Sequence, residues 1–185
     1  TDVAREAGET CQEDVWNQIE SAQFLVRQGN ALAREGDIEG AVAKFKQARK
    51  LDATLDLEPE AEAKRFAVPA LVEAGKDFAY QGEYKEAVAK FQQALTLDPT
   101  LDLEPEAEAK RLAVPVLLAR GEQRVKDKEY KEALEDYTIA QKIDATVKIS
   151  AQTWNEICAL GSLLGSLLGE AAAVLEACEK AVTLE

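Results

Sequence analysis

The sequence predicts an all-α protein, an α-solenoid of about four stacked antiparallel helix hairpins. The first observation is an internal repeat, because similar segments begin at Leu25, Leu71 and Leu117, which are 46 residues apart. The second observation is that apolar residues recur every three or four positions, as they do on one face of a helix. A repeat of this length indicates stacked helical units, since each unit has an apolar face that it cannot bury alone.

The second copy shows what one unit contains. Its apolar residues run at helical spacing from Leu71 to Phe78, and Gly82 then interrupts them. A second amphipathic run extends from Tyr84 to Leu95. Two helices joined by a short glycine turn form an antiparallel hairpin. Sustained alternation of apolar and polar residues is missing from the sequence, so strands are not expected.

The connection between units predicts where each long first helix begins. The pair Asp98-Pro99 ends a helix, and Pro105 follows a short acidic stretch. Proline favours the first helical position, and the acidic residues after it suit the positive end of the helix dipole. We therefore expect a helix from Pro105 to about Lys126, and the equivalent Pro59 predicts the same start one repeat earlier.

Further prolines lie inside these long helices. Pro69 and Pro115 each remove a backbone hydrogen bond, so they predict a kink in both helices. The first unit has no such prolines, but Thr10 and Glu13 have the spacing of a capping box. We therefore expect its long helix to begin near Cys11.

Residues 150–184 are expected to form a divergent fourth unit. The residues that mark its two helices are Trp154, Ile157 and Leu160, then Val174, Cys178 and Ala181. Gly161, Gly165 and Gly169 fall four residues apart on one face. This spacing favours close packing against the third unit, although in a membrane it would suggest helix dimerisation.

The whole chain is therefore expected to form a single helical repeat domain. Its approximate units are residues 11–52, 58–98, 104–144 and 150–184. The sequence contains no methionine and starts with Thr1. We therefore expect the chain to be processed or to be part of a larger protein.

Composition excludes several classes of function. Asp and Glu number 35 against 22 Lys and Arg, which gives a formal net charge of −13. Such a chain repels nucleic acid and anionic membranes, because a phosphate binder needs a basic surface. The sequence has no histidine, which excludes histidine-based metal sites and histidine-activated nucleophiles.

The three cysteines, Cys11, Cys158 and Cys178, are far apart and odd in number. We interpret them as reduced thiols of an intracellular, cytoplasmic protein, since a disulfide scaffold would be shorter and richer in cysteine. The N-terminus lacks the apolar core of a signal peptide. The most membrane-like stretch, Ile157 to Leu168, is shorter than the roughly 20 residues that cross a bilayer.

Candidate catalytic chemistry is weak. Carboxylate pairs such as Asp56 with Glu58 and Asp102 with Glu104 recur in the connecting segments, where they suit solvated helix starts better than acid–base catalysis. A calcium loop would need a glycine turn that this segment lacks. Phosphate-binding and serine-hydrolase motifs are also missing. We predict a protein that is not an enzyme and has no cofactor, catalytic residue or metal site.

Small and large residues recur at matching positions of the three copies. They are Gly29, Gly36, Ala41, Phe45 and Ala48; then Gly75, Phe78, Gly82, Tyr84, Ala87, Phe91, Ala94 and Pro99; then Gly121, Tyr130, Ala133, Tyr137 and Ala140. This pattern resembles the tetratricopeptide repeat, in which small residues let two helices approach and aromatic rings fill the gap beside them. A standard repeat has about 34 residues, and we assign the excess of roughly a dozen to the connecting segments and extended first helices.

This resemblance implies a binding surface, because the first helices of tetratricopeptide repeats line a concave face. The matching positions are Val26, Asn30 and Arg34, then Val72, Lys76 and Tyr80, then Leu118, Glu122 and Lys126. Asn30 and Lys76 could belong to a clamp for a C-terminal carboxylate, but Val26, Val72 and Leu118 replace its polar groups. The mixed groove suits an amphipathic helix or an extended segment with apolar anchors. Alternatively, Val72, Leu118 and Val125 pack between units.

The resemblance therefore implies a non-catalytic scaffold that binds a protein or peptide, in another chain or in its own parent chain. The tail is similar to that of helical repeats in large bacterial multidomain proteins. The alternative is self-association, because the exposed end of a repeat array is apolar unless it is capped. Nucleic acid and membranes are not expected as partners.

Overall fold

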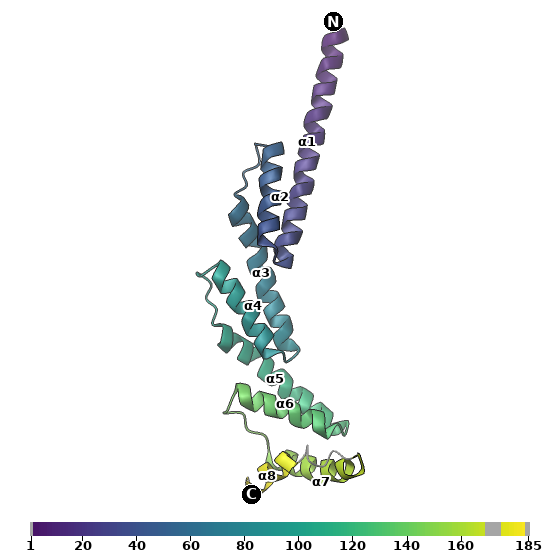
Figure 1. Ribbon diagram of the computed structural model, residues 1–185, viewed down its shortest axis with the longest axis vertical. Coiled ribbons are helices and arrows are strands. Elements are labelled where there is room, and N and C mark those ends of the chain that lie inside the picture. Colours follow the sequence, from purple (N-terminus) through teal and green to yellow (C-terminus); the bar gives the residue numbers. More distant parts are fainter. Residues whose placement is uncertain (1, 169–174, 184–185) are drawn as a thin grey trace. The chain divides into compact units, whose positions relative to one another are not determined.

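The computed structural model describes residues 2–168 and 175–183, and this part of the chain contains helices but no strand. The helices follow one another in consecutive hairpin pairs, which confirms the predicted all-α solenoid of helix hairpins (Figure 1). They are α1 (Asp2–Glu35), α2 (Ile38–Leu51), α3 (Pro59–Tyr80), α4 (Tyr84–Leu97), α5 (Pro105–Lys126), α6 (Tyr130–Ile143), α7 (Ala151–Leu168) and α8 (Leu175–Thr183).

The predicted start of the long helices is confirmed where proline marks it. Helix α3 begins at Pro59, and α5 extends from Pro105 to Lys126. The prediction for the first helix is wrong, because α1 begins at Asp2 rather than near Cys11. The residues before Cys11 are mostly good helix formers such as Ala, Arg and Glu, and their propensity outweighs the capping-box spacing.

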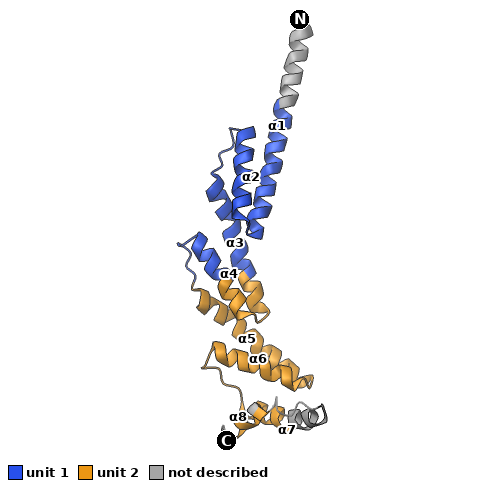
Figure 2. Cartoon of the chain, in the orientation of Figure 1, with its two compact units in different colours: residues 1–74, 90–103 blue, residues 75–89, 104–185 orange. Residues whose placement is uncertain are grey.

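The chain divides into two compact units (Figure 2). Unit 1 comprises residues 1–74 and 90–103, and unit 2 comprises residues 75–89 and 104–185. Helices α1 and α2 lie in unit 1, α5 to α8 lie in unit 2, and the boundary crosses α3 and α4.

Within the first three hairpins the turn contains a residue in the left-handed conformation. Gly36 and Gly82 fill this position after α1 and α3 with φ of 92° and 82°. Lys128 fills it after α5 with φ of 64°. A side chain makes this conformation costly, so the third turn carries strain that glycine avoids in the other two.

Contacts between glycine and an aromatic ring set the separation of the paired helices. A Cβ atom built on Gly29 would lie 2.6 Å from Cε1 of Phe45, and one built on Gly121 would lie 2.6 Å from Cε1 of Tyr137. Phe45 and Tyr137 are both buried. The small–large pairing that the sequence indicated is therefore a direct contact in the first and third hairpins.

A short turn follows the second helix of the first three hairpins. The Asp52 carboxylate accepts hydrogen bonds from the backbone N–H and the hydroxyl of Thr54. The pairs Asp98–Thr100 and Asp144–Thr146 repeat this arrangement. These turns end each hairpin in the same way and direct the chain towards the next long helix.

The fourth hairpin corrects the prediction of reduced thiols. Cys158 of α7 and Cys178 of α8 form a disulfide, with Cα atoms 4.7 Å apart. Sequence spacing did not indicate this pair, because it becomes close only when α7 and α8 fold back on each other. The disulfide also removes the thiol argument for a cytoplasmic location. The side chains of Cys11, Leu160, Gly161, Gly165, Gly169 and Val174 lie outside the described residues.

Trp154 forms the centre of this fourth hairpin. It is buried and meets Tyr137 of α6 edge to face, with ring centroids 5.8 Å apart. Ile157, Ala177 and Ala181 belong to the same apolar cluster. Among the described helices, none is both long and apolar enough to cross a membrane.

Candidate peptide-binding surface

The residues that the sequence predicted as a binding surface lie on the long helices of both units. Unit 1 contains Val26, Asn30, Arg34 and Val72, and unit 2 contains Lys76, Tyr80, Leu118, Glu122 and Lys126. Each unit therefore brings together part of the predicted set. The contacts within a unit determine what its share of the predicted residues can bind.

In unit 1 one predicted residue, Arg34, lies over an aromatic ring of α3. The guanidinium of Arg34 lies 5.1 Å from the centroid of the Phe66 ring, and that of Arg65 lies 5.4 Å from the same centroid. Phe66 is thus close to two cations, which its π-system attracts. Arg65 also pairs with Glu62 at 3.0 Å.

The other predicted residues of unit 1 are less exposed. Val26 packs against the apolar cluster of Ala33, Ala41 and Phe45. Asn30 is half-buried, and its Oδ1 atom is buried without a hydrogen-bond partner. Such an oxygen is costly in an apolar setting, because a buried acceptor loses its hydrogen bonds to water.

In unit 2 the end of α3 and the start of α5 form a mixed surface. Tyr80 is 56% exposed, and the Arg111 guanidinium donates bonds of 2.8 and 2.7 Å to the Glu108 carboxylate. We call Lys76, Tyr80, Glu108 and Arg111 the Tyr80 surface.

Electrostatic interactions connect the members of the Tyr80 surface. The hydrogen bonds from Arg111 lower the pKa of Glu108, and the charge of Lys76 adds a smaller lowering. The hydrogen bonds to Glu108 raise the pKa of Arg111, with a small contribution from Tyr80. The two helices therefore present an exposed ring beside charges of both signs.

The remaining predicted residues lie along α5. Leu118 packs against the apolar cluster of unit 2, and Val125 is itself part of that cluster. These two side chains contribute to the interior. Glu122 and Lys126 are exposed near the C-terminal end of the helix.

The sequence did not predict two ion pairs near the starts of the long helices α3 and α5. Glu62 with Arg65 and Glu108 with Arg111 occupy the same places in successive repeats, three residues apart. Both pairs belong to the repeated sequence EAKR, which from sequence alone is typical of a solvated helix start. Its role in a surface becomes clear only when the fold places it beside the preceding long helix.

An ionic cluster in unit 2 was also missed. Asp136 is 1% exposed, and its carboxylate lies 2.6 Å from Nη2 of Arg120 and 2.6 Å from Nη1 of Arg124. Arg120 also donates to the backbone oxygen of Gln81 at 2.8 Å. The hydrogen bonds to Asp136 raise the pKa of Arg120. The signal was present, since Arg124 stands where the first two copies have Leu32 and Phe78.

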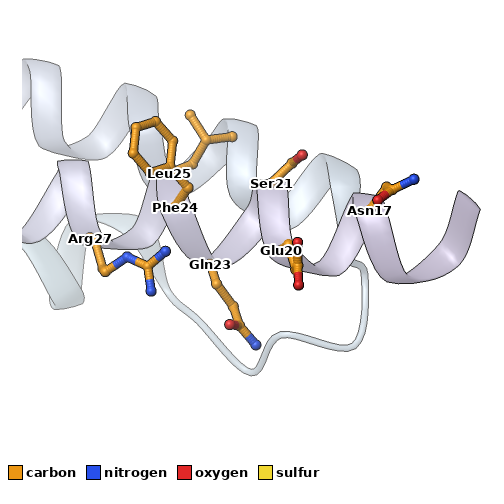
Figure 3. Close-up of a pocket in the computed structure, with 7 residues that line it drawn as sticks. All are labelled: Asn17, Glu20, Ser21, Gln23, Phe24, Leu25 and Arg27. Carbon is orange, nitrogen blue, oxygen red and sulfur yellow. The ribbon is translucent and has the colours of Figure 1, made fainter. Parts of the chain in front are cut away.

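A shallow hollow on α1 was likewise not predicted (Figure 3). It has a volume of about 870 Å³ and lies along the helix surface. Its lining residues are Asn17, Glu20, Ser21, Gln23, Phe24, Leu25 and Arg27. Across the residues that the structure describes, there is no group of three acidic or cysteine side chains that could hold a metal ion.

Paired helices, glycine turns and glycine–aromatic contacts define a helical-hairpin repeat protein. A family model described as Tetratricopeptide repeat matches residues 68–101, which span most of α3 and all of α4. This match supports the resemblance to the tetratricopeptide repeat that the sequence indicated. Repeats of this family mediate protein–protein interaction. A comparison with curated proteins found no match.

Proposed function

We propose that this chain is a non-catalytic scaffold that binds a peptide or helix of a partner through the faces of its long helices. The Tyr80 surface carries this proposal. It combines an aromatic ring that is 56% exposed with a carboxylate and a guanidinium from α5. Exposed aromatic and arginine side chains are the residues that dominate binding energy in protein interfaces.

The chemistry of this surface limits the partner. Tyr80 can pack against an apolar side chain, while Glu108 and Arg111 can pair with a basic and an acidic group. An amphipathic helix or extended segment with an apolar anchor and flanking charges fits this arrangement. In unit 1, Phe66 offers a ring beside the two cations Arg34 and Arg65.

The wider predictions remain part of this proposal. The partner segment belongs to another protein or to the parent chain, within a multidomain protein of bacterial type as the resemblance implies. The exposed positions Glu122 and Lys126 extend the surface along α5. The surface carries charges of both signs, which suits recognition of a protein. The net charge of −13 is unfavourable for binding nucleic acid.

The test uses peptides selected for binding to the purified chain from a random display library. Their affinities are then measured for the wild type, the double variant K76A/Y80A and the control variant I139A/K142A. Ile139 and Lys142 are exposed on α6, which carries none of the predicted positions. We expect K76A/Y80A to weaken binding about tenfold or more, with unchanged helicity by circular dichroism. Equal weakening in both variants, or none in K76A/Y80A, would contradict the proposal.

A second candidate function is self-association through α1. Trp16 and Phe24 are 59% and 53% exposed on this helix. One repeat later, Ala63 and Phe66 occupy the places of Asn17 and Glu20, and there they pack against the first hairpin. The face of α1 thus corresponds to the face of α3 that packs against the first hairpin. Because this face of α1 is exposed, we expect a hairpin from a second copy of this chain to pack against it.

Light scattering at several protein concentrations tests this second function. If α1 mediates self-association, the wild type forms a dimer or larger species and W16A/F24A remains monomeric. A wild type that stays monomeric at all concentrations would exclude it. This result would leave the peptide-binding proposal intact, because that proposal depends on α3 and α5.

A further inference from the structure

Helix α8 is attached to unit 2 by small apolar contacts. The residues that it buries in the cluster around Trp154 are Ala177 and Ala181. Its larger apolar side chains Leu175 and Val182 are 58% and 76% exposed. Because hydrophobic stabilisation scales with the apolar area removed from water, these contacts hold α8 weakly.

Lys180 provides polar contacts between α8 and the rest of unit 2. The ammonium of Lys180 lies 4.7 Å from the centroid of the Trp154 ring and donates a 3.1 Å bond to Oε1 of Gln141. Such a cation–π contact at a partly exposed site contributes modestly. The part of α8 that the structure describes has nine residues, and isolated helices of that length are marginal in water.

The disulfide between Cys158 and Cys178 connects α8 covalently to α7. Both cysteines are partly exposed rather than buried, so a small thiol reagent can reach them. Cys178 lies between Ala177 and Lys180, at the centre of the docked face. The covalent bond and the noncovalent contacts of α8 therefore act on the same short segment.

We propose that the Cys158–Cys178 pair is a redox modification site that controls the docking of α8 over Trp154. A dithiol reductant attacks one sulfur of the disulfide, the S–S bond breaks, and a mixed disulfide forms. The second thiol of the reductant then displaces the cysteine sulfur. The protein gains two electrons and two protons as two thiols, and the reductant leaves as a cyclic disulfide.

Reduction changes the surface that α8 covers. Without the bond, α8 keeps noncovalent contacts alone, which include those of its two alanines and Lys180, and the helix leaves its position. The surface that it covers contains Trp154 and Ile157, which are 1% and 0% exposed in the docked state. Redox state thus determines whether an apolar surface on α7 is covered.

The experiment compares the full chain before and after treatment with dithiothreitol. Hydrogen exchange measured by mass spectrometry should become about tenfold or more faster for residues 177–182 after reduction. Exchange in α5 and α6 should not change. In the variant W16F, which leaves Trp154 as the only tryptophan, emission should shift to longer wavelength as the ring meets water.

Matched variants separate redox control from simple loss of structure. C158S and C178S should resemble the reduced wild type under all conditions, while C11S should respond to dithiothreitol like the wild type. Alkylation with N-ethylmaleimide before and after treatment counts the thiols released. The proposal is overturned if α8 exchanges equally slowly in both states, or if both cysteines of the reduced protein remain alkylatable after treatment with oxidised glutathione.

Discussion

The first and third hairpins share a frame but differ in their interior. In both, a glycine of the long helix contacts an aromatic ring of the short one, through Gly29 with Phe45 and Gly121 with Tyr137. Around this contact the first hairpin is apolar, with Leu32 beside the cluster. The third hairpin instead buries Asp136 between two arginines.

This difference shows which contacts define the fold and which can vary. The glycine–aromatic contact fixes the distance between the helices, so residues one turn away can change from apolar to ionic. The exchange is possible because Arg120 and Arg124 hydrogen-bond to both carboxylate oxygens of Asp136. An unpaired carboxylate at the same place would be strongly destabilising.

The largest test of this comparison removes the centre of the ionic cluster. Asp136→Ala leaves two arginines without their shared partner, and breaking such a buried pair typically costs about 3–5 kcal/mol. The equivalent residue of the first hairpin is Lys44, which is half-buried. We expect Lys44→Ala to change the free energy of unfolding by less than about 0.5 kcal/mol. Urea unfolding of both variants checks this, and similar losses would remove the distinction between the hairpins.

The aromatic rings offer a second test, through alkaline pH. Burial raises the pKa of Tyr137 to about 12 from an ordinary value of 10.0. The folded protein thus holds this proton more tightly than the unfolded chain does. The resulting stability is complete below pH 10 and is lost as the pH rises through about 12, a loss of about 2–3 kcal/mol.

Tyr137→Phe isolates this effect, because phenylalanine has no proton to lose. The wild type should lose more stability than Tyr137→Phe between pH 10 and 12, as measured by urea unfolding. The first hairpin, where Phe45 takes this place, contributes no such term. Parallel pH profiles for the two proteins would show that the buried hydroxyl does not stabilise the folded state.

The shared contact itself is tested by adding one methyl group to each glycine. In Gly29→Ala and Gly121→Ala the new Cβ would lie 2.6 Å from the facing ring, so the helices must separate. Overpacking of this kind costs about 1–3 kcal/mol, reduced by the better helix propensity of alanine. Thermal unfolding should show similar losses for both variants. A loss confined to one hairpin would mean that the frame is not shared.

Most of this frame could be predicted from the sequence, but the differences between copies could not. Prolines and glycines act locally, so Pro59, Pro105 and Gly82 marked helix starts and a turn correctly. The positions of the aromatic residues were likewise correct. Local signals were sufficient here because each depends on neighbouring residues alone.

The features that were missed depend on residues that are distant in the sequence. Cys158 and Cys178 are 20 residues apart and meet only when α7 and α8 pair. Arg120 and Asp136 are 16 residues apart, and each alone resembles a solvated surface charge. The Tyr80 surface similarly needs α5 to lie beside the end of α3 before Arg111 can be recognised.

The turns provide a smaller test, in which one substitution should increase the free energy of unfolding. Lys128 adopts φ of 64° where Gly36 serves in the first hairpin. Lys128→Gly relieves the clash of Cβ with the backbone and should stabilise unit 2 by about 0.5–1 kcal/mol. Gly36→Lys should cost a similar amount in unit 1. The midpoint of urea unfolding measures both, and a destabilised Lys128→Gly would show that the lysine side chain itself supports the turn.

The smallest effect is expected at acid pH, in the turns that end the first and third hairpins. Asp144 accepts bonds from Thr146, which are the first cause of its lowered pKa of about 2, and Lys110 lies 3.1 Å away. Because the folded pKa is below the ordinary 3.8, the stabilisation is present above pH 4 and is lost as the pH falls through about 2. Asp52 accepts the same two bonds from Thr54, but among the described residues it has no ion pair. Asp144→Asn should therefore flatten the decrease in melting temperature between pH 4 and 2 more than Asp52→Asn does. Equal profiles would mean that Lys110 contributes nothing, and that the turn alone binds the carboxylate.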